Sequence, residues 1–270
     1  MDKRAIGVFD SGLGGLTAVK ELRRVLPNES ILYFGDTGRV PYGTRSSDTI
    51  LKYARQDMRF LLSNNVKAIV AACGTVSSAA KEALEELDVP HIDVISPTAQ
   101  AAAVATKNGR VGVIATSATI KSGAFQKKLT ELRDTLTVFP IACPLLVPLV
   151  ENGFIAPEEP ITRLVLERYL TPLIANHVDT LIMGCTHYPI IEKTIAAVMG
   201  ENVTLIDSGR ETAHCCAAVL QENHLLCQGG QPPRHRFFVS DGVEGFHDIA
   251  EIFLGSDIGG EVKRIDIEKY

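Results

Sequence analysis

The sequence has no tryptophan, and aromatic residues make up only 6% of its 270 positions. No apolar run in it approaches the roughly 18 residues that a membrane-spanning helix needs. The opening Met1-Asp2-Lys3-Arg4, which strand-like residues follow at once, does not resemble a signal peptide. These absences predict a cytoplasmic protein with no membrane partner.

Positive charge is not in excess. Lysine and arginine number 27 against 32 aspartate and glutamate residues, which gives a formal net charge of −5. We therefore expect no basic surface that attracts nucleic acid or an anionic membrane. An anionic small molecule would have to be held by local features, because the overall field opposes its binding.

The cysteines show none of the spacings that are typical of metal or redox sites. None forms a C-x-x-C pair and none matches a structural zinc site, so we expect no metal. In a reducing cytosol they should be free thiols, most of them small buried apolar groups. They are Cys73, Cys143, Cys185, Cys215, Cys216 and Cys227.

Apolar β-branched runs alternate with helical patterns, which predicts parallel sheets covered by helices. The segment 66–75 aligns without a gap with 178–187, and in both a cysteine stands seven residues after the first valine. A match at several successive strands indicates an internal duplication. The other matching pairs are 5–9 with 110–114 and 89–93 with 203–207.

The fold class that follows is α/β, with two pseudo-symmetric open parallel-sheet domains and the active site in the cleft between them. The length suits two domains of roughly 100–150 residues each. Other elements expected in the first unit are strands at 31–34, 67–72 and 91–94, and helices at about 16–26, at about 47–64 and from about Ser77.

The end of the chain has no second copy, so we expect it to fold back onto the first unit. The first domain would then comprise 1–97 plus 208–270, and the second 98–207. The expected elements of this last segment are a loop at 228–233, a strand at 236–239, a short helix near 245–254 and a final strand near 261–267.

Polar residues follow five of the predicted strands, where ligands bind in an open parallel sheet. Turns need polar residues in any case, and for a single cluster that explanation is sufficient. Two of the clusters, however, are duplicates of each other and both contain a cysteine. The five are Asp10-Ser11, Asp36-Thr37, Cys73-Gly74-Thr75, 116–119 and Cys185-Thr186-His187.

Two equivalent thiols, Cys73 and Cys185, would face each other if the two halves close over a shared cleft. A lone cysteine after a buried strand is usually inert, but a thiol on each side of one carbon is what stereoinversion of an amino acid requires. One sulfur takes the α-proton while the other donates a proton to the opposite face. A free thiol has a pKa of about 8.5, so the ionised sulfur needs help from its surroundings.

Three further features bear on such a site. The turn Asp10–Gly15 is rich in glycine but is not G-x-G-x-x-G, which makes dinucleotide binding unlikely and leaves its backbone N–H groups free to dock a carboxylate. His187 could be half of a metal site, although a proton partner of Cys185 fits its position better. Glu151 alone would be taken for a charge at the start of a helix.

Five motifs stand out along the chain: 9–16, Val40-Pro41-Tyr42-Gly43, Ala72-Cys73-Gly74-Thr75, 148–151 and 183–189. Together they resemble the aspartate/glutamate racemase family, and glutamate racemases in particular, from about residue 5 to 210. The resemblance implies interconversion of L- and D-glutamate without pyridoxal phosphate, metal or any other cofactor. It also implies supply of D-glutamate for peptidoglycan and a possible homodimer.

The resemblance also implies roles for single residues. Cys73 and Cys185 match the two acid/base thiols; Asp10 matches the carboxylate that assists the first thiol, and Glu151 and His187 match the groups that assist the second. One departure is Gly74, because the family more often has asparagine between the cysteine and the threonine. Positions that match contacts to the substrate's carboxylates and ammonium are Asp10, Ser11, Pro41, Tyr42, Gly43, Gly74, Thr75, Thr119, Thr186 and His187.

Three alternatives stay open on the sequence alone. An aspartate racemase would share the thiol mechanism and differ in the depth of its pocket. A cysteine-nucleophile hydrolase or amidotransferase would use one cysteine and leave the other without a task. A non-catalytic glutamate-binding protein would bind its ligand without exchanging the Cα hydrogen.

Overall fold

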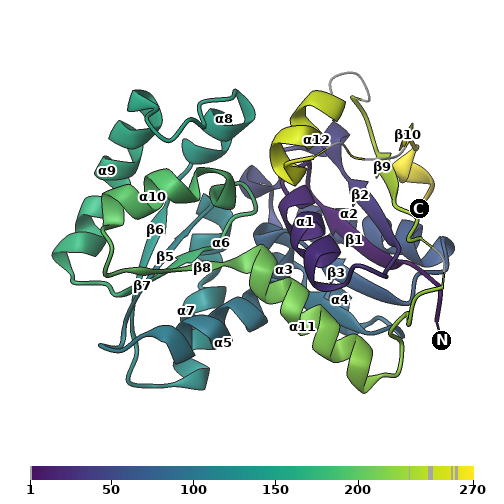
Figure 1. Cartoon of the computed structure of the whole chain (residues 1–270), viewed down its shortest axis with the longest axis horizontal. Helices are drawn as coiled ribbons and strands as arrows, with labels where there is room; N and C mark the ends of the chain where they lie inside the picture. Colours follow the sequence, from purple (N-terminus) through teal and green to yellow (C-terminus); the bar gives the residue numbers. More distant parts are fainter. Residues whose placement is uncertain (1, 231, 243–245, 257, 259–260) are drawn as a thin grey trace.

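A computed structural model describes residues 2–230, 232–242, 246–256, 258 and 261–270. The chain forms two open sheets that lie side by side, each covered by helices (Figure 1). Every strand pair in both sheets is parallel. This confirms the predicted fold class of two parallel-sheet α/β halves. Among the described residues, no helix combines the length and the apolar character that crossing a membrane requires.

The first sheet has six strands in the order β10-β9-β2-β1-β3-β4. The end of the chain extends its edge, since β9 pairs with β2 and β10 pairs with β9. The strands are β1 (Ile6–Asp10), β2 (Ile31–Gly35), β3 (Ala68–Ala71), β4 (His91–Asp93), β9 (Arg236–Val239) and β10 (Val262–Arg264).

The second sheet has four strands in the order β6-β5-β7-β8. This order repeats the β2-β1-β3-β4 portion of the first sheet, so the repeat that was detected in the sequence is also a repeat of topology. The strands are β5 (Arg110–Ala115), β6 (Thr137–Ala142), β7 (Thr180–Met183) and β8 (Thr204–Asp207).

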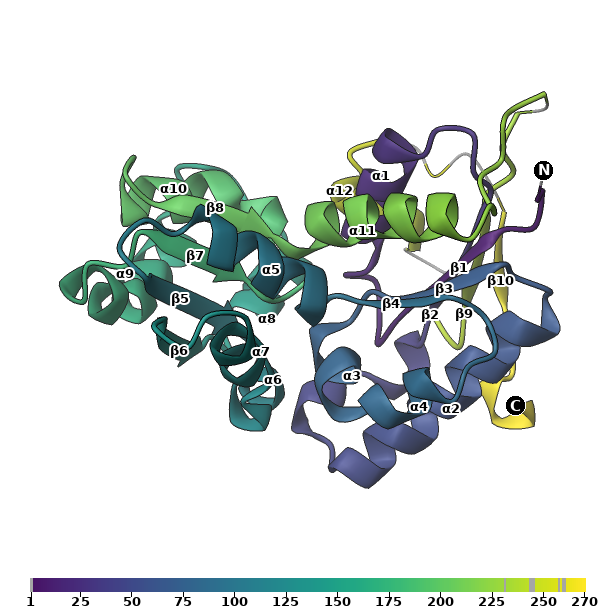
Figure 2. The same ribbon diagram turned by 90° about the horizontal axis from the view of Figure 1, so that it is seen from below.

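Helices cover both faces of the first sheet: α1 and α11 lie on one face, and α2, α3 and α4 on the other (Figure 2). The period of two along a strand explains this, because Ile6 and Val8 belong to one apolar core while Phe9 belongs to another. The helices of the first half are α1 (Leu16–Val25), α2 (Ser47–Ser63), α3 (Gly74–Ala79), α4 (Lys81–Glu85), α11 (Ser208–Glu222) and α12 (Phe246–Leu254).

The chain passes between the halves at two places, where β4 leads into α5 and β8 leads into α11. At the second crossing Asp207 caps α11 by accepting from the N–H groups of Gly209 and Arg210, at 2.8 and 3.3 Å. The helices of the second half are α5 (Ile95–Ala105), α6 (Ser117–Ser122), α7 (Ala124–Leu132), α8 (Leu146–Glu151), α9 (Pro160–Ala175) and α10 (Glu192–Met199).

The expected elements mostly agree with the structure, with three informative differences. The helix expected from Ser77 begins at Gly74, directly after Cys73. The final strand is shorter than the predicted 261–267, because β10 ends at Arg264 and a 3-10 helix follows at Ile267–Lys269. Strand β6 was not predicted at all, since it contains Pro140.

Pro140 is tolerated because β6 is an edge strand of the sheet. On the open side of such a strand there is no neighbouring strand whose hydrogen bond the missing N–H of proline would remove.

Two predicted positions, Gly245 at the start of the expected helix and Gln231 in the expected loop, lie outside the described residues. The proposed domain limits at 97/98 and 207/208 stay predictions.

Candidate functional site

The two duplicated cysteines stand at equivalent places in the two sheets. Cys73 follows β3 and is the residue before α3, with an extended backbone (φ −94°, ψ 123°). Cys185 follows β7, the counterpart of β3 in the second sheet. Both strands lie next to the first strand of their half, on the side opposite the second strand. In each sheet this is the point where the order of strands reverses, which is where open α/β sheets bind ligands.

The Cys73 thiol lies in a nearly sealed environment, with only 6% of the residue exposed. Its Sγ is 3.4 Å from the hydroxyl of Ser11, which belongs to the turn after β1. Burial, with the nearby charge of Asp10, raises the pKa of the Cys73 thiol to about 12, although the Ser11 hydroxyl acts in the opposite direction. At neutral pH this sulfur is therefore a protonated thiol, able to act as an acid.

Asp10 is buried at the carboxyl end of β1, and its Oδ2 accepts from the N–H of Gly12 at 3.0 Å. Burial raises the pKa of the Asp10 carboxyl, while the charge of His187 and nearby backbone N–H groups pull it down. Gly15 is required beside it, because a β-carbon at that position would lie 2.6 Å from Cβ of Asp10. Asp10 thus links the first thiol with a charged group of the second half.

The second thiol belongs to a chain of three polar groups. Nδ1 of His187 lies 3.8 Å from Sγ of Cys185, and Nε2 of the same ring lies 3.0 Å from Oε1 of Glu151. Burial lowers the pKa of the imidazole, but the hydrogen bonds and charges of Cys185 and Glu151 outweigh it and raise the value to about 10. At neutral pH the ring is therefore cationic, and it would stabilise a thiolate at Cys185.

The two halves meet where these groups lie. Thr17 of α1 donates its hydroxyl to the carbonyl of Thr186 at 2.9 Å. A β-carbon built at Gly14 would lie 2.6 Å from the His187 ring, and one at Gly74 would lie 2.8 Å from the carbonyl oxygen of Gly184. The residues that flank Cys73 therefore contact those that flank Cys185.

Hydroxyl groups from both halves line the same region. The Oγ1 atoms of Thr75 and Thr116 are 3.2 Å apart, and those of Thr116 and Thr119 are 3.0 Å apart. A β-carbon at Gly43 would lie 3.6 Å from Cβ of Thr116. Thr116, which also caps α6 by accepting from the Thr119 N–H, belongs to the polar cluster 116–119 that the sequence placed at the end of a predicted strand. Its place after β5 is equivalent to that of Asp10-Ser11 after β1, although only Thr119 of this cluster was predicted to contact the substrate.

Tyr42 and Pro41 occupy less direct positions than their neighbours. The Tyr42 ring is buried, and its hydroxyl donates to Asp36 and lies 3.2 Å from Oδ2 of Asp57. That hydroxyl is therefore engaged behind the site, which leaves the backbone of Tyr42 as the part able to face a ligand. Pro41 is exposed. Thr186 is buried, with its Oγ1 3.3 Å from Nδ1 of His187.

The site is closed in this structure, with Cys73 6% and Cys185 7% exposed. Open grooves of about 430 and 710 Å³ lie elsewhere, one along α2 and the other at the amino ends of β1, β2 and β9. Within the part of the chain that the structure describes, no three His, Cys, Asp or Glu side chains are grouped as ligands for a metal. Both sulfurs are therefore almost inaccessible in this arrangement of the two halves.

Glu151→Gln is expected to lower the pKa of the His187 imidazole from about 10 toward its ordinary 6.5, because the charge and acceptor that favour the cation are both weakened. Titration of the labelled histidine ring by NMR measures this directly. Glu158→Gln, at an exposed glutamate without a hydrogen-bond partner among the described residues, is the matched control. An unchanged titration in the Glu151 variant would show that Glu151 does not hold the proton on the ring.

Comparison with known proteins places these residues in context. The sequence model of the family described as Asp/Glu/Hydantoin racemase matches residues 17–216. A glutamate racemase from Syntrophus aciditrophicus is 45% identical over 263 residues, which cover 97% of this chain and 96% of the relative.

Solved structures agree with the sequence comparison. A glutamate racemase from Bacillus anthracis superposes with a TM-score of 0.93 at 42% identity, covering 98% of each chain. One from Francisella tularensis, in complex with D-glutamate, superposes with a TM-score of 0.92 at 40% identity over 100% of each chain. The similarity therefore extends over both halves and over the interface between them.

Proposed function

Because this chain belongs to the Asp/Glu/hydantoin racemase family, we propose that it interconverts L- and D-glutamate with two thiols and no cofactor. The observation that carries the proposal is the pair of thiols at equivalent strand ends, one per half, with contrasting surroundings. Cys73 is held as a thiol, while Cys185 lies beside a cationic imidazole. One sulfur is thus prepared to donate a proton and the other to accept one.

The reaction then follows from which sulfur holds the proton. The Cys185 thiolate takes the α-proton of the enantiomer that presents it, and the electron pair of the broken C–H bond stays on Cα beside the substrate carboxylate. The Cys73 thiol donates its proton to the opposite face, which forms the inverted C–H bond. The enzyme is left with a thiolate at Cys73 and a thiol at Cys185, the form that acts on the other enantiomer.

Asp10 and the His187–Glu151 pair would allow the two protonation states to alternate. Burial raises the pKa of Asp10, which favours its neutral carboxyl beside a Cys73 thiolate and so lowers the repulsion between the two groups. On the other side, a cationic His187 compensates the Cys185 thiolate, and Glu151 holds that charge in place. Each thiol thus has its own partner.

Binding of the substrate carboxylates falls, in this proposal, to backbone N–H groups and hydroxyls. Ser11 and Gly43 offer backbone N–H groups, and Thr75, Thr119 and Thr186 offer hydroxyls. Thr75 and Thr119 both contact Thr116, and Thr186 contacts His187. His187 also supplies positive charge that the chain as a whole lacks. We further propose a cytoplasmic location, supply of D-glutamate for peptidoglycan and a homodimer as the working assembly.

Incubation of each glutamate enantiomer with the protein in D₂O tests the mechanism, with the Cα–H signal followed by NMR and no cofactor added. Two bases predict deuterium in the inverted product, while the unconverted substrate keeps its protium at early times. Equal labelling of both enantiomers would point to a single base. Binding without any exchange would favour the non-catalytic alternative, and faster exchange of aspartate than of glutamate would favour an aspartate racemase.

A further inference from the structure

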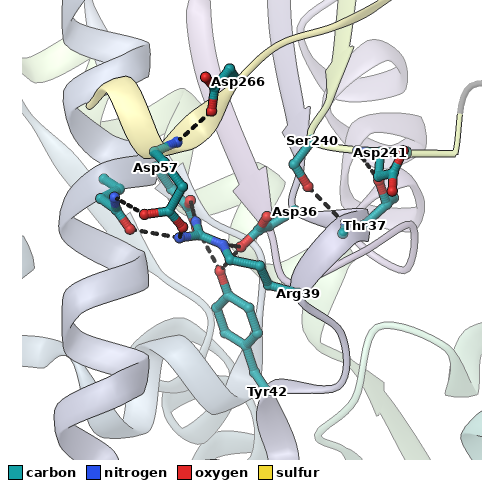
Figure 3. Close-up of polar contacts among 11 residues, drawn as sticks. Asp36, Thr37, Arg39, Tyr42, Asp57, Ser240, Asp241 and Asp266 are labelled. Carbon is teal, nitrogen blue, oxygen red and sulfur yellow. Dashed lines mark hydrogen bonds and ion pairs between the residues drawn. The ribbon is translucent and has the colours of Figure 1, made fainter.

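Behind the site, Arg39 lies at the centre of a buried polar cluster (Figure 3). Its Nε is 2.6 Å from Oδ2 of Asp36, and its Nη2 is 3.1 Å from Oδ1 of Asp57. Nη1 donates to Oε1 of Gln56 at 2.6 Å and to Oε1 of Glu268 at 3.2 Å. One guanidinium therefore joins the end of β2, the helix α2 and the C-terminal 3-10 helix.

The planar face of the same guanidinium is also engaged. Its Cζ lies 4.0 Å from the centre of the Tyr53 ring, as expected for a cation–π contact. A lysine in this place would keep the charge but would lose the fork of N–H donors and the flat contact surface. The arrangement is thus specific for arginine.

The cluster holds two carboxylates whose side chains are 0% exposed, those of Asp36 and Asp57. Burying two like charges beside one cation is unfavourable unless one carboxyl keeps its proton. Burial, reinforced by the charge of Asp36, raises the pKa of Asp57 well above its ordinary range, although Arg39 acts in the opposite direction. Burial therefore favours the neutral form of Asp57 within the cluster.

The segment 40–43 connects this cluster with the site. At its back, the Tyr42 hydroxyl donates to Asp36 and lies 3.2 Å from Asp57. At its front, Gly43 faces Thr116 of the second half, and a β-carbon at Gly12 would lie 3.1 Å from the Val40 side chain. This segment thus lies beside both the glycine-rich turn and the opposite half.

A second set of contacts joins the start of the same loop to Ser240 and Asp241, the two residues that follow β9. The N–H of Gly38 donates to Oγ of Ser240 at 2.8 Å, and the N–H of Asp241 donates to Oγ1 of Thr37 at 3.1 Å. Figure 3 shows these contacts beside the Arg39 cluster. The loop 36–44 is therefore fixed at both its start and its end.

We propose that Arg39 is a positioning residue for catalysis, which holds the backbone of 40–43 where it binds a carboxylate of the substrate. The inference rests on the proposed racemisation of glutamate and extends it to a residue that does not touch the substrate. A guanidinium with acceptors on three separate elements fixes one loop relative to all of them. Loss of that anchor releases the binding backbone without altering either thiol.

The test is a comparison of Arg39→Met and Arg39→Lys with the wild-type chain, measuring kcat and KM for both glutamate enantiomers. We expect Arg39→Met to raise KM by about 10- to 100-fold and to change kcat by less than about threefold, the pattern for loss of uniform binding. The KM of Arg39→Lys should lie between those of the wild-type chain and Arg39→Met, because lysine restores the charge but not the fork of N–H donors. Arg55→Met is the matched control, since Arg55 is on α2 and, among the residues that the structure describes, forms only an exposed ion pair with Glu86.

A KM within about twofold of wild type in a folded Arg39→Met variant would overturn the inference, even if its melting temperature falls. Should that variant fail to fold, Tyr42→Phe decides, because it removes only the hydroxyl that joins the loop to the two acids. A KM raised by about threefold or more supports the inference, and a smaller change overturns it. A wild-type chain that does not racemise glutamate would instead remove the proposed function, and the inference with it.

Discussion

Cys73→Ala and Cys185→Ala are each expected to lower kcat for racemisation by about 10³- to 10⁴-fold, in both directions, because each turnover uses one sulfur as base and the other as acid. Steady-state polarimetry with each enantiomer measures the loss. The two variants should be nearly equal in effect, since the thiols exchange roles between the forward and the reverse reaction. Secondary structure by circular dichroism should be unchanged.

A matched control is available in the same half of the molecule. Cys143 is fully buried after β6, and the pKa of its thiol is raised to about 12 by burial and by the charge of Cys185. Cys143→Ala should keep kcat within about threefold of wild type, because a buried thiol that contacts no substrate acts as a small apolar group. If one active-site variant were inactive while the other kept most of its activity, a single-cysteine nucleophile would be the better explanation.

Gly74→Asn is expected to reduce kcat/KM for glutamate by about fivefold to 150-fold, from an overpacking penalty of about 1–3 kcal/mol at 1.36 kcal/mol per tenfold. The penalty arises because a β-carbon at position 74 would lie 2.8 Å from the carbonyl oxygen of Gly184. That oxygen is backbone, so it cannot move aside as a side-chain tip could. The asparagine side chain would hold the two halves apart beside both thiols.

Gly74→Ala separates this steric effect from a gain in hydrogen bonding. Both variants carry the β-carbon, but only asparagine carries an amide that could bind the substrate. A shared loss would confirm that the contact between the halves is limiting, whereas an asparagine variant that equals or exceeds wild type would contradict it. Ser78→Asn, one turn further along α3, controls for placing the same side chain on this helix.

Much of the fold could be predicted because its main signal is local. Buried strands such as β1 and β3 are short apolar runs, and the repetition of the pattern gave the two halves. Strand β6 escaped because Pro140 argues against a strand, and only its edge position, a property of the whole sheet, makes the proline acceptable. The start of α3 at Gly74 escaped for a similar reason, since glycine is a poor helix former and no N-cap side chain marks the position.

Only part of the chemistry of the site could be predicted from the sequence. The repeat predicts that Cys73 and Cys185 occupy equivalent strand ends, and the structure brings the residues that flank them into contact. The role of the Tyr42 hydroxyl could not be predicted, because its partners Asp36 and Asp57 come from two elements whose packing no spacing reveals. Arg39 was missed for the same reason: its partners lie up to 229 positions away in sequence.

The place of β9 in the first sheet has a consequence for how the chain folds during synthesis. The four strands of the second sheet lie between Arg110 and Asp207, so that sheet can form as soon as those residues leave the ribosome. Strand β2, by contrast, pairs with β1 on one edge, but its other edge stays unpaired until β9 has been synthesised. Such non-local pairing slows folding. The first sheet is therefore the first to leave the ribosome but the last to be completed. Until β9 is in place, β2 presents an open edge to other nascent chains.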